Sequence, residues 1–597
     1  MSDDAPLPEG SAALGRDLAR LFTLFADLVE VEGSEPAKAS AYRRAAIGLR
    51  DFPGDLGALA AAGRLREIPG VGPILARKIA EYLDTGRIEA FDRLRAAVPA
   101  GVAGLLAVRG VGPKLAAACW RGLGVTDREG LRAACLDGRL ATLPGVGPRR
   151  AARVLEALQA AAHPALLLAE AAPLAEAIAG ALRGREGLAA VEPAGEVRRA
   201  CPLVARLDFV VVGDPAAVAA ALAALALPWH TPPQPAGATA PWRRVTGTLA
   251  VPGPDGGRDL PCTALVCPSE ALGTALLLAT ASDGHLAELA AWRRDRGEGA
   301  DALPLCADET AAYAALDLPW IPPELREGWG EVRAATEGRL LPPGGRLVEE
   351  ADLRSELHCH TLWSDGRADL GTMAAAARAR GYRHLAVTDH SGSLVVAHGL
   401  SAERLRAQRR EVDRLNAAAD DGFVLLQGAE VEILRDGTLD YPDDALAALD
   451  FCVASLHNAH GQGAGELTAR LLRALAHPAV DVIGHPTGRR LLRRDPQPLD
   501  LDRVAEEAAR RGKALEINGS PERMDLDGAL ARRARASGVR WFALDSDAHS
   551  PAGLADARWA IATARRAGLG PADVLNALPL DALHAWRARR GGGVPGA

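Results

Sequence analysis

Short apolar runs alternate with amphipathic stretches from about residue 352 onward, and this alternation limits the fold more than any other feature of the chain. Seven runs have the length and composition of buried strands, and stretches such as 402–416 and 501–511 have helical periodicity. Parallel strands joined by crossover helices produce this pattern, and seven such units close more readily into a barrel than into a sandwich. The predicted strands are 354–358, 384–388, 423–428, 451–455, 480–484, 514–517 and 541–544.

Side chains that commonly bind metal ions lie at or just after the ends of these runs. In a β/α barrel all strand carboxyl ends open on one face, so residues far apart in the chain meet in one cleft. Nine imidazole and carboxylate groups in one cleft require cations, and the sequence therefore predicts a multinuclear metal site. The nine residues are His358, His360, Asp365, His390, Glu430, His457, His485, Asp547 and His549.

The segments that hold these side chains resemble the polymerase and histidinol phosphatase (PHP) family: 358–366, 388–390, 428–430, 455–457, 484–486 and 545–549. The resemblance implies a (β/α)7 barrel that hydrolyses phosphate esters. In such sites one ion generates a nucleophile from a bound water, and its neighbours neutralise the phosphoryl oxygens. Mixed imidazole and carboxylate ligands suit Zn²⁺ and Mn²⁺, and the resemblance favours Mn²⁺ for nuclease work.

The resemblance also implies how the ligands divide among three ions. The first ion would be held by the residues that carry catalysis, namely His358, His360, Glu430 and Asp547. Asp365, His390 and His549 would hold the second ion. Glu430 would bridge to a third ion, held by His457 and His485.

A repeated turn precedes a helical stretch three times near the amino terminus, at 68–72, 108–112 and 143–147. Its glycines let the backbone approach a phosphate, and the following helix start presents free N–H groups to it. The repeats resemble helix–hairpin–helix motifs, and the first two lie where family X DNA polymerases carry theirs. The expected DNA-binding positions are Gly70, Gly72, Gly110, Gly112, Gly145 and Gly147. The third repeat is either a further DNA contact or a hinge.

Segments 40–46 and 68–78 resemble the small 5′-phosphate-binding domain of family X polymerases. Lys78 aligns with the lyase nucleophile of that domain, and Lys38 with Arg77 would lower its pKa enough for Schiff-base chemistry. The alternative interpretation, which we favour, is a surface lysine that contacts a phosphate.

The middle of the chain resembles the family X catalytic palm but lacks its key groups. Residues 195–199 match the element Gly-Ser-x-Arg-Arg, with Glu196 in place of serine, and we expect Glu196 to pair with Arg198 or Arg199. Where the family has Asp-x-Asp, this chain has Arg206 and Asp208. The third family carboxylate falls at Thr263, although Asp259 lies nearby. An arginine in a two-metal cage competes with the Mg²⁺ ions, so we expect weak or lost polymerase activity.

The length of 597 residues allows several domains. We predict a helical DNA-binding domain at 1–90, a fingers-like helix–hairpin–helix domain at 91–160, an α+β palm and thumb at 161–320, a linker at 321–351 and a PHP domain at 352–590. The net charge of −7 gives no global signature of a nucleic-acid binder. The eight cysteines form no C-x-x-C pair, and no apolar run is long enough to span a bilayer.

Taken together, the motifs resemble the bacterial family X DNA polymerases that carry a PHP domain. The resemblance implies a cytoplasmic, nucleoid-associated DNA-repair protein whose PHP domain acts as a 3′–5′ exonuclease or 3′-phosphatase on gapped, nicked or 3′-ended DNA. Three alternatives stay open: an active gap-filling polymerase, a small-molecule phosphatase of the histidinol-phosphate type, and a noncatalytic DNA scaffold. Protein partners and the oligomeric state are not predicted.

Overall fold

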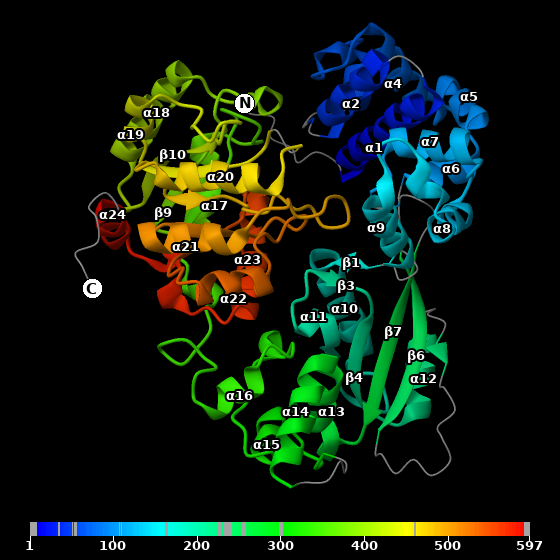
Figure 1. The fold of residues 1–597 in the computed structure, drawn as a ribbon, viewed down its shortest axis with the longest axis vertical. Helices are drawn as coiled ribbons and strands as arrows, with labels where there is room; N and C mark the ends of the chain where they lie inside the picture. Colours follow the sequence, from blue (N-terminus) through cyan, green and yellow to red (C-terminus); the bar gives the residue numbers. More distant parts are fainter. Residues whose placement is uncertain are drawn as a thin grey trace. The chain divides into compact units, whose positions relative to one another are not determined.

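The computed structural model describes residues 9–33, 36–50, 52, 56–106, 108, 110–160, 165–224, 229–230, 242–251, 258–297, 303–458 and 461–589 (Figure 1). The chain divides into two compact units, Met1–Pro164 and Ala165–Ala597. The break lies close to the predicted boundary between the helical domains and the palm.

The first unit is all helical, as predicted. Its elements are α1 (Glu9–Glu32), α2 (Pro36–Arg50), α3 (Leu56–Ala61), η1 (Leu65–Glu67), α4 (Pro73–Thr85), α5 (Glu89–Ala97), α6 (Ala100–Leu105), α7 (Pro113–Leu123), α8 (Arg128–Leu136), η2 (Arg139–Thr142) and α9 (Gly147–Ala160). One hydrophobic cluster extends from Leu18 to Leu158. The rings of Phe25 and Phe91 contact each other within it, with centroids 5.4 Å apart. The two predicted helical domains therefore share a single core.

The second unit begins with an α+β palm. Its five-stranded sheet has the order β2-β4-β7-β6-β5, in which β4 and β7 are parallel and the other pairs antiparallel. Its elements are β1 (Leu166–Leu167), α10 (Leu168–Leu182), β2 (Leu188–Ala194), α11 (Gly195–Arg198), β3 (Leu203–Val204), β4 (Leu207–Gly213), α12 (Pro215–Ala223), β5 (Trp229–His230), β6 (Arg243–Val251), β7 (Arg258–Cys267) and η3 (Ser269–Ala271).

A helical layer follows the palm: α13 (Leu272–Thr280), α14 (Asp283–Asp295), α15 (Glu309–Ala314), η4 (Pro323–Leu325) and α16 (Glu331–Thr336). The last two elements lie in segment 321–351, which we expected to be a linker. That segment is instead packed, because Ile321, Leu325 and Val332 belong to the same buried cluster as Leu277 and Tyr313. Pro, Gly and charge hid this packing in the sequence, because the buried residues of the segment follow no helical or strand period.

Seven consecutive parallel strands form the rest of the second unit, in the order β14-β13-β12-β11-β10-β9-β8. They are β8 (Ser355–Cys359), β9 (His384–Val387), β10 (Val424–Glu432), β11 (Phe451–Ser455), β12 (Val482–Ile483), β13 (Ala514–Asn518) and β14 (Phe542–Asp545). A parallel bridge between Cys359 and Ala548 joins the two ends of the sheet. All seven predicted strands are confirmed, and the sheet is a nearly closed barrel. Strand β10 is longer than predicted, so Glu430 lies within it and not after it.

Helices surround the strands, with α20, α21 and α22 on the near side of the barrel in Figure 1. The remaining elements are η5 (Glu350–Asp352), α17 (Leu370–Ala379), η6 (Val395–Ala397), α18 (Ala402–Ala418), α19 (Asp443–Ala447), α20 (Ala464–Ala476), α21 (Leu501–Arg511), α22 (Gly528–Ala536), η7 (Pro551–Asp556), α23 (Ala557–Arg566), η8 (Pro571–Asp573), η9 (Leu575–Ala577) and α24 (Leu580–Arg589). Leu583 and Trp586 of α24 pack against an apolar cluster of strand residues such as Phe451. This helix closes the amino-terminal end of the barrel and leaves the carboxyl end for polar groups.

Candidate functional site

Glu430 of β10 lies at the centre of the carboxyl end of the barrel. Its Oε1 atom is 2.9 Å from Nε2 of His485 and 3.2 Å from Nε2 of His457. Its Oε2 atom is 2.8 Å from Nδ1 of His390, 3.5 Å from Nε2 of His358 and 3.7 Å from Nε2 of His360. The carboxylate is buried, and one oxygen faces each side of the cluster.

The other two predicted carboxylates join the remaining histidines to this centre. Oδ1 of Asp365 is 3.4 Å from Nε2 of His549 and 3.5 Å from Nε2 of His390. Oδ1 of Asp547 is 3.2 Å from Nε2 of His360 and 3.8 Å from Nε2 of His358. The structure therefore brings all nine sequence-predicted side chains into one cluster.

The geometry groups the ligands somewhat differently from the family resemblance. Three sets of side chains each place ligand atoms within 4.8 Å of one another: His360, Asp365, His390 and His549; His358, His360 and Glu430; and His390, Glu430 and His457. His360 and His390 each belong to two sets, whereas the resemblance assigned each of them to one ion. Both rings lie between carboxylates from different strands, and spacing along the chain could not show this.

These side chains fit metal ions. Nε2 of His358 and both ring nitrogens of His360 are buried without a hydrogen-bond partner among the described residues. A buried polar atom without a partner is costly, and a cation that accepted these lone pairs would remove the cost. The imidazole and carboxylate donor set can bind either Zn²⁺ or Mn²⁺.

The protonation states of His360, His485 and Glu430 favour metal binding, whereas neighbouring carboxylates raise the pKa of His358, His390, His457 and His549. Burial, reinforced by His549 and His390, lowers the pKa of His360 to about 3, and burial beside Arg523 lowers that of His485 to about 3. Burial opposes the ionisation of Glu430, yet His457, His390 and His358 hold the pKa of its carboxyl well below the usual range. Two neutral imidazoles and an ionised carboxylate are the forms that bind a metal ion.

Two further carboxylates orient the ligands, and the sequence reasoning missed both. Oε1 of Glu516 lies 2.6 Å from Nδ1 of His358, and Oε2 of Glu432 lies 2.9 Å from Nδ1 of His457. Such outer carboxylates fix the tautomer of a metal-binding histidine and raise its basicity. Each is fully or almost fully buried on a strand. An acidic residue within a buried apolar run was the signal that could have identified them.

The palm residues predicted from the sequence also lie close together, but they form an ion pair and not a cluster of metal ligands. Nε of Arg206 lies 2.7 Å from Oδ1 of Asp208, and Thr263 on β7 is the register partner of Asp208 on β4. Asp259 precedes Thr263 by four residues on β7, where its register partner on β6 is Ala250. At roughly 3.3 Å per residue it lies about 13 Å from the Asp208 level. Asp259 therefore does not supply the missing carboxylate.

The predicted pairing of Glu196 with Arg198 or Arg199 is wrong. Oε2 of Glu196 accepts hydrogen bonds from the backbone N–H groups of Ala205 at 2.6 Å and Arg206 at 3.3 Å. Arg198 instead pairs with Glu309 at 2.6 Å, and Arg199 pairs with Glu327 at 2.9 Å. Glu309 and Glu327 are largely buried and require cations, whereas two backbone donors already satisfy Glu196.

The first two glycine turns have the same conformation. Gly70 and Gly110 have φ values of +80° and +87°, and Gly72 and Gly112 begin α4 and α7 with φ of −83°. The third turn departs from them, because Gly147 lies within α9 with φ of +60°. In each turn the intervening valine is buried and the first glycine is exposed, so the first two helix starts face outward in the same way.

Lys78 lines a cavity of about 490 Å³ in the first unit, together with Lys38, Arg93, Phe25 and Tyr42. Its ammonium nitrogen lies 5.5 Å from the centre of the Phe25 ring. Burial lowers the pKa of Lys78, and Lys38 and Arg93 add to the effect against Glu81. Arg77, expected to contribute, is exposed and does not line the cavity. Consecutive residues of a helix point about 100° apart, so Arg77 of α4 lies to one side of Lys78.

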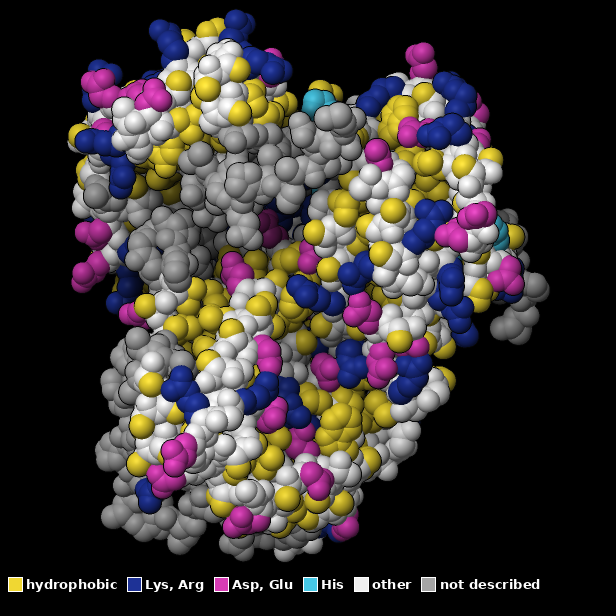
Figure 2. All heavy atoms as spheres, turned by 180° about the vertical axis from the view of Figure 1, so that it is seen from behind, with side chains coloured by type: hydrophobic (Ala, Val, Ile, Leu, Met, Phe, Trp, Pro, Cys, Tyr) yellow, Lys and Arg dark blue, Asp and Glu magenta, His cyan; other side chains and the backbone are white. Residues whose placement is uncertain are grey.

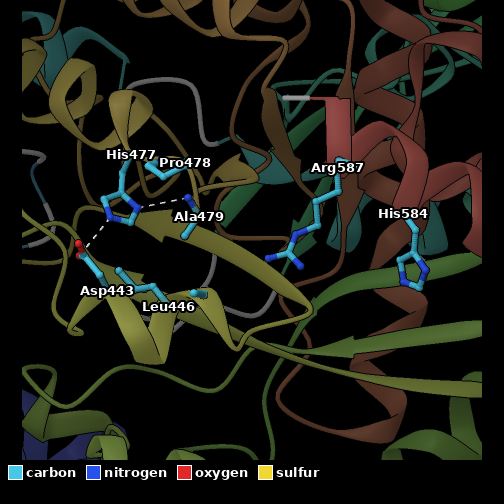
Figure 3. Close-up of a pocket in the computed structure, with 9 residues that line it drawn as sticks. Asp443, Leu446, His477, Pro478, Ala479, His584 and Arg587 are labelled. Atoms are coloured by element: carbon cyan, nitrogen blue, oxygen red, sulfur yellow. Dashed lines mark hydrogen bonds and ion pairs between the residues drawn. The ribbon is translucent and has the colours of Figure 1, made fainter. Parts of the chain in front are cut away.

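A second cavity, of about 560 Å³, lies near the amino-terminal end of the barrel (Figure 3). His477 faces Asp443 at 3.4 Å, with Arg587 and His584 on the other side. Arg587 pairs with buried Asp481 at 3.2 Å. None of the nine predicted ligands lines this cavity, so it is distinct from the metal centre.

Known protein families match separate segments of the chain, and one known protein matches almost its full length. Family models of a helix-hairpin-helix domain, a SAM-like helix-hairpin-helix tandem and a PHP domain match residues 15–88, 102–160 and 356–520. The DNA polymerase/3′-5′ exonuclease PolX of Bacillus subtilis is 33% identical over 587 residues, which are 96% of this chain and 99% of that protein. The chain belongs to the PolX family.

The PHP part of this PolX-family chain also resembles smaller proteins. A probable phosphatase of Thermoanaerobacter sp. is 29% identical over 234 residues, and one of Syntrophotalea carbinolica is 30% identical over 235 residues. Each alignment covers 37% of this chain, with 89% and 90% of the respective phosphatase.

The surface and the helices add two observations. On the face shown in Figure 2, Lys and Arg side chains are interspersed with Asp and Glu, so charge by itself marks no binding face there. In the described part of the chain, no helix combines the length and apolar character needed to cross a membrane.

Proposed function

We propose that the PHP barrel hydrolyses phosphate esters at DNA ends, as a 3′–5′ exonuclease, a 3′-phosphatase or both. The single observation that carries this proposal is Glu430, a buried carboxylate that contacts five ligand-type histidines from four other strand ends. The relatives support the reaction class, since they include a DNA polymerase/3′-5′ exonuclease and several phosphatases.

The barrel side chains would hold up to three ions, Mn²⁺ or Zn²⁺. When bound, such ions supply an activated water and neutralise the phosphoryl oxygens. Glu430 would contribute to two of the ligand sets and Asp365 to the third, and Asp547 lies beside His360 and His358. Glu516 and Glu432 orient His358 and His457. His358, His360, Glu430 and Asp547 are the proposed catalytic set.

The helical unit would hold gapped, nicked or 3′-ended DNA through the glycine turns, and the protein would act in the cytoplasm at the nucleoid. The turns at Gly70, Gly72, Gly110 and Gly112 support this role by their shared geometry at helix starts. Gly145 and Gly147 would contact DNA as well, and the match of a helix-hairpin-helix tandem over this segment supports that role.

Nucleotide addition by the palm is absent or very weak in this proposal. Arg206 pairs with the Asp208 carboxylate, which would otherwise hold Mg²⁺. Thr263 lies at the position where a further carboxylate is needed. Arg198 and Arg199, which would meet the triphosphate, are engaged by Glu309 and Glu327. A primer-extension assay with Mg²⁺ or Mn²⁺ separates this proposal from an active gap-filling polymerase.

The cavity at Lys78 supports a second function, the binding of a 5′-phosphate end. Three cations, Lys38, Lys78 and Arg93, line one cavity of the helical unit. Borohydride trapping on a substrate with a 5′-deoxyribose phosphate tests lyase chemistry. Trapping that disappears in Lys78→Ala shows a lyase, whereas weaker binding without trapping shows a phosphate contact.

The central experiment uses the full chain and a labelled gapped duplex. Chelator-treated protein is reloaded with Mn²⁺ or Zn²⁺, and release of 3′ nucleotides and of 3′ phosphate is measured separately. Histidinol phosphate is tested in parallel. Metal-dependent activity on the duplex supports the proposal, and activity confined to histidinol phosphate would favour the small-molecule phosphatase.

A further inference from the structure

Two loops beside the metal centre are joined into one unit. They follow β12 and β13, and we call residues 485–494 and 519–527 the paired loops. The backbone N–H and the hydroxyl of Thr487 donate to the Asp525 carboxylate at 3.1 Å and 2.8 Å. Leu491 donates its N–H to the carbonyl of Glu522 at 2.7 Å. Nε of Arg489 donates to the carbonyl of Arg523 at 2.8 Å. Hydrogen bonds therefore hold the paired loops to each other.

The outer side of the paired loops packs on the palm. Met524 is 1% exposed and belongs to the hydrophobic cluster of the palm, with Leu168 of α10 and Phe209 of β4. Leu491 packs against the same cluster, and Trp559 of α23 is part of it. The palm core therefore extends into the barrel and supports these loops.

A polar contact holds the same two parts together. Arg566 at the end of α23 donates to the carbonyl of Arg199 and pairs with Glu327 at 2.8 Å. Arg199 itself pairs with Glu327 from the palm side. An arginine that resembles a triphosphate contact of the family thus helps to join palm and barrel.

The inner side of the paired loops presents Arg523 to the metal centre. Its side chain is 10% exposed, and Nε lies 3.3 Å from Oδ2 of Asp547. The other oxygen of Asp547 faces His360. Within the described ranges the structure gives the Arg523 guanidinium this ion pair and no side-chain hydrogen bond. A guanidinium has five N–H donors in a planar fork, and that fork matches the oxygens of a phosphate.

We propose that Arg523 binds the non-bridging oxygens of the substrate phosphate, and that the palm positions it through Met524. The proposal rests on phosphoester hydrolysis by the barrel. The palm, with its carboxylate cage lost, keeps a role as the support of a catalytic residue in the neighbouring domain. The competing explanation is that Arg523 only holds Asp547 in place for metal binding.

The first experiment separates these explanations with Mn²⁺-loaded full-length Arg523→Gln and Arg523→Lys. Arg510→Gln on α21, an exposed arginine paired with Glu507, is the matched control. Bound metal is counted, inorganic phosphate binding is measured by calorimetry, and steady-state kinetics are measured on a 3′-labelled oligonucleotide. We expect an unchanged metal content, a loss of phosphate affinity of about tenfold or more in Arg523→Gln, and partial retention in Arg523→Lys.

Two outcomes overturn the assignment of Arg523: wild-type phosphate affinity in Arg523→Gln, or loss of metal from that variant. Failure of the underlying function is seen separately. If the wild-type protein hydrolysed no DNA end, the proposed function would fall, while the phosphate measurement would still report on Arg523.

The second experiment tests the positioning residue. Met524→Ala removes the contact with the palm, Met524→Leu restores most of its volume, and Leu168→Ala opens a cavity at another position of the same cluster. We expect Met524→Ala to weaken phosphate binding and to lower kcat/KM about tenfold at 25 °C, and Met524→Leu to restore both. Leu168→Ala should lower the Tm about as much as Met524→Ala does, but it should not weaken phosphate binding. Equal effects of Met524→Ala and Leu168→Ala on phosphate affinity would overturn the positioning role.

Discussion

The palm and the barrel each bury a carboxylate on a parallel strand, and they neutralise it differently. In the palm, Asp208 is paired with Arg206 at 2.7 Å, so its charge is compensated within the protein. In the barrel, Glu430 contacts histidines, and ring nitrogens of His358 and His360 beside it have no hydrogen-bond partner among the described residues. The barrel thus leaves lone pairs for ions, whereas in the palm Arg206 places a competing positive charge beside the carboxylate.

Because of this difference, we expect the loss of ions or of a side chain to affect the two sites differently. A site whose charges are balanced by side chains is stable without ions and offers no place for them. A site with buried lone pairs facing one point is completed only by cations.

Glu430→Ala should reduce 3′-end hydrolysis at least about 1000-fold, because it removes a bridging ligand and leaves neighbouring cations poorly shielded from one another. The measurement is nucleotide release from a labelled gapped duplex in Mn²⁺. Glu506→Ala, at an exposed position of α21, serves as the control. Exonuclease activity at the wild-type level in Glu430→Ala would place the nuclease elsewhere in the chain.

Glu516→Gln should lower metal affinity or activity about 10- to 100-fold, as outer carboxylates of metal sites do. It keeps the volume of the side chain but weakens the hydrogen bond that orients His358. Titration of the metal-free protein with Mn²⁺ measures the effect. An affinity equal to that of the wild type would show that Glu516 has only a packing role.

Gly110→Val with Gly112→Val should weaken binding to gapped DNA about tenfold, since the second helix start could no longer approach a phosphate. Hydrolysis of a nitrophenyl phosphodiester should stay near the wild-type level, because the barrel is untouched. Gly124→Val, at the other end of α7 with φ of +68°, matches the backbone strain of the Gly110 change. Equal loss of DNA binding in both would assign the effect to strain.

His384→Leu should reduce the sensitivity of the fold to acid. His384 is fully buried, both ring nitrogens lack a partner among the described residues, and burial with His584 and Arg354 nearby lowers its pKa to about 4. Between about pH 6.5 and 4 the unfolded chain binds the extra proton, so stability falls as the pH falls through this window. The wild type should lose about 1 kcal/mol more than His384→Leu between pH 7.5 and 5.5, as measured by denaturant unfolding. Parallel pH profiles would contradict this.

Arg206→Asp should leave nucleotide addition undetectable, which is the smallest expected change. Glu196 stays hydrogen-bonded to the backbone N–H of Ala205, and Thr263 still faces position 208 without a carboxylate. Primer extension in Mg²⁺ and in Mn²⁺ checks this, with the wild type beside it. Robust templated extension by either protein would show that the palm retains a working cage.

The barrel and the membership of the metal cluster could be predicted from local sequence patterns. Period-two alternation and strand-end position are local properties, and parallel topology then brings every strand end to one face. That is why His358 and His549, almost two hundred residues apart, could be assigned to one cleft before their contacts were known. The glycine turns at Gly70 and Gly110 were equally local, because their φ values require glycine.

Tertiary structure set the pairing of charges. Arg198 finds Glu309 and Arg199 finds Glu327, each more than one hundred residues away, instead of the adjacent Glu196. It also decided that segment 321–351 is packed, and that Met524 of the barrel lies in the core of the palm. A long charged side chain can reach many partners, and the partner is selected by which carboxylates folding has removed from water.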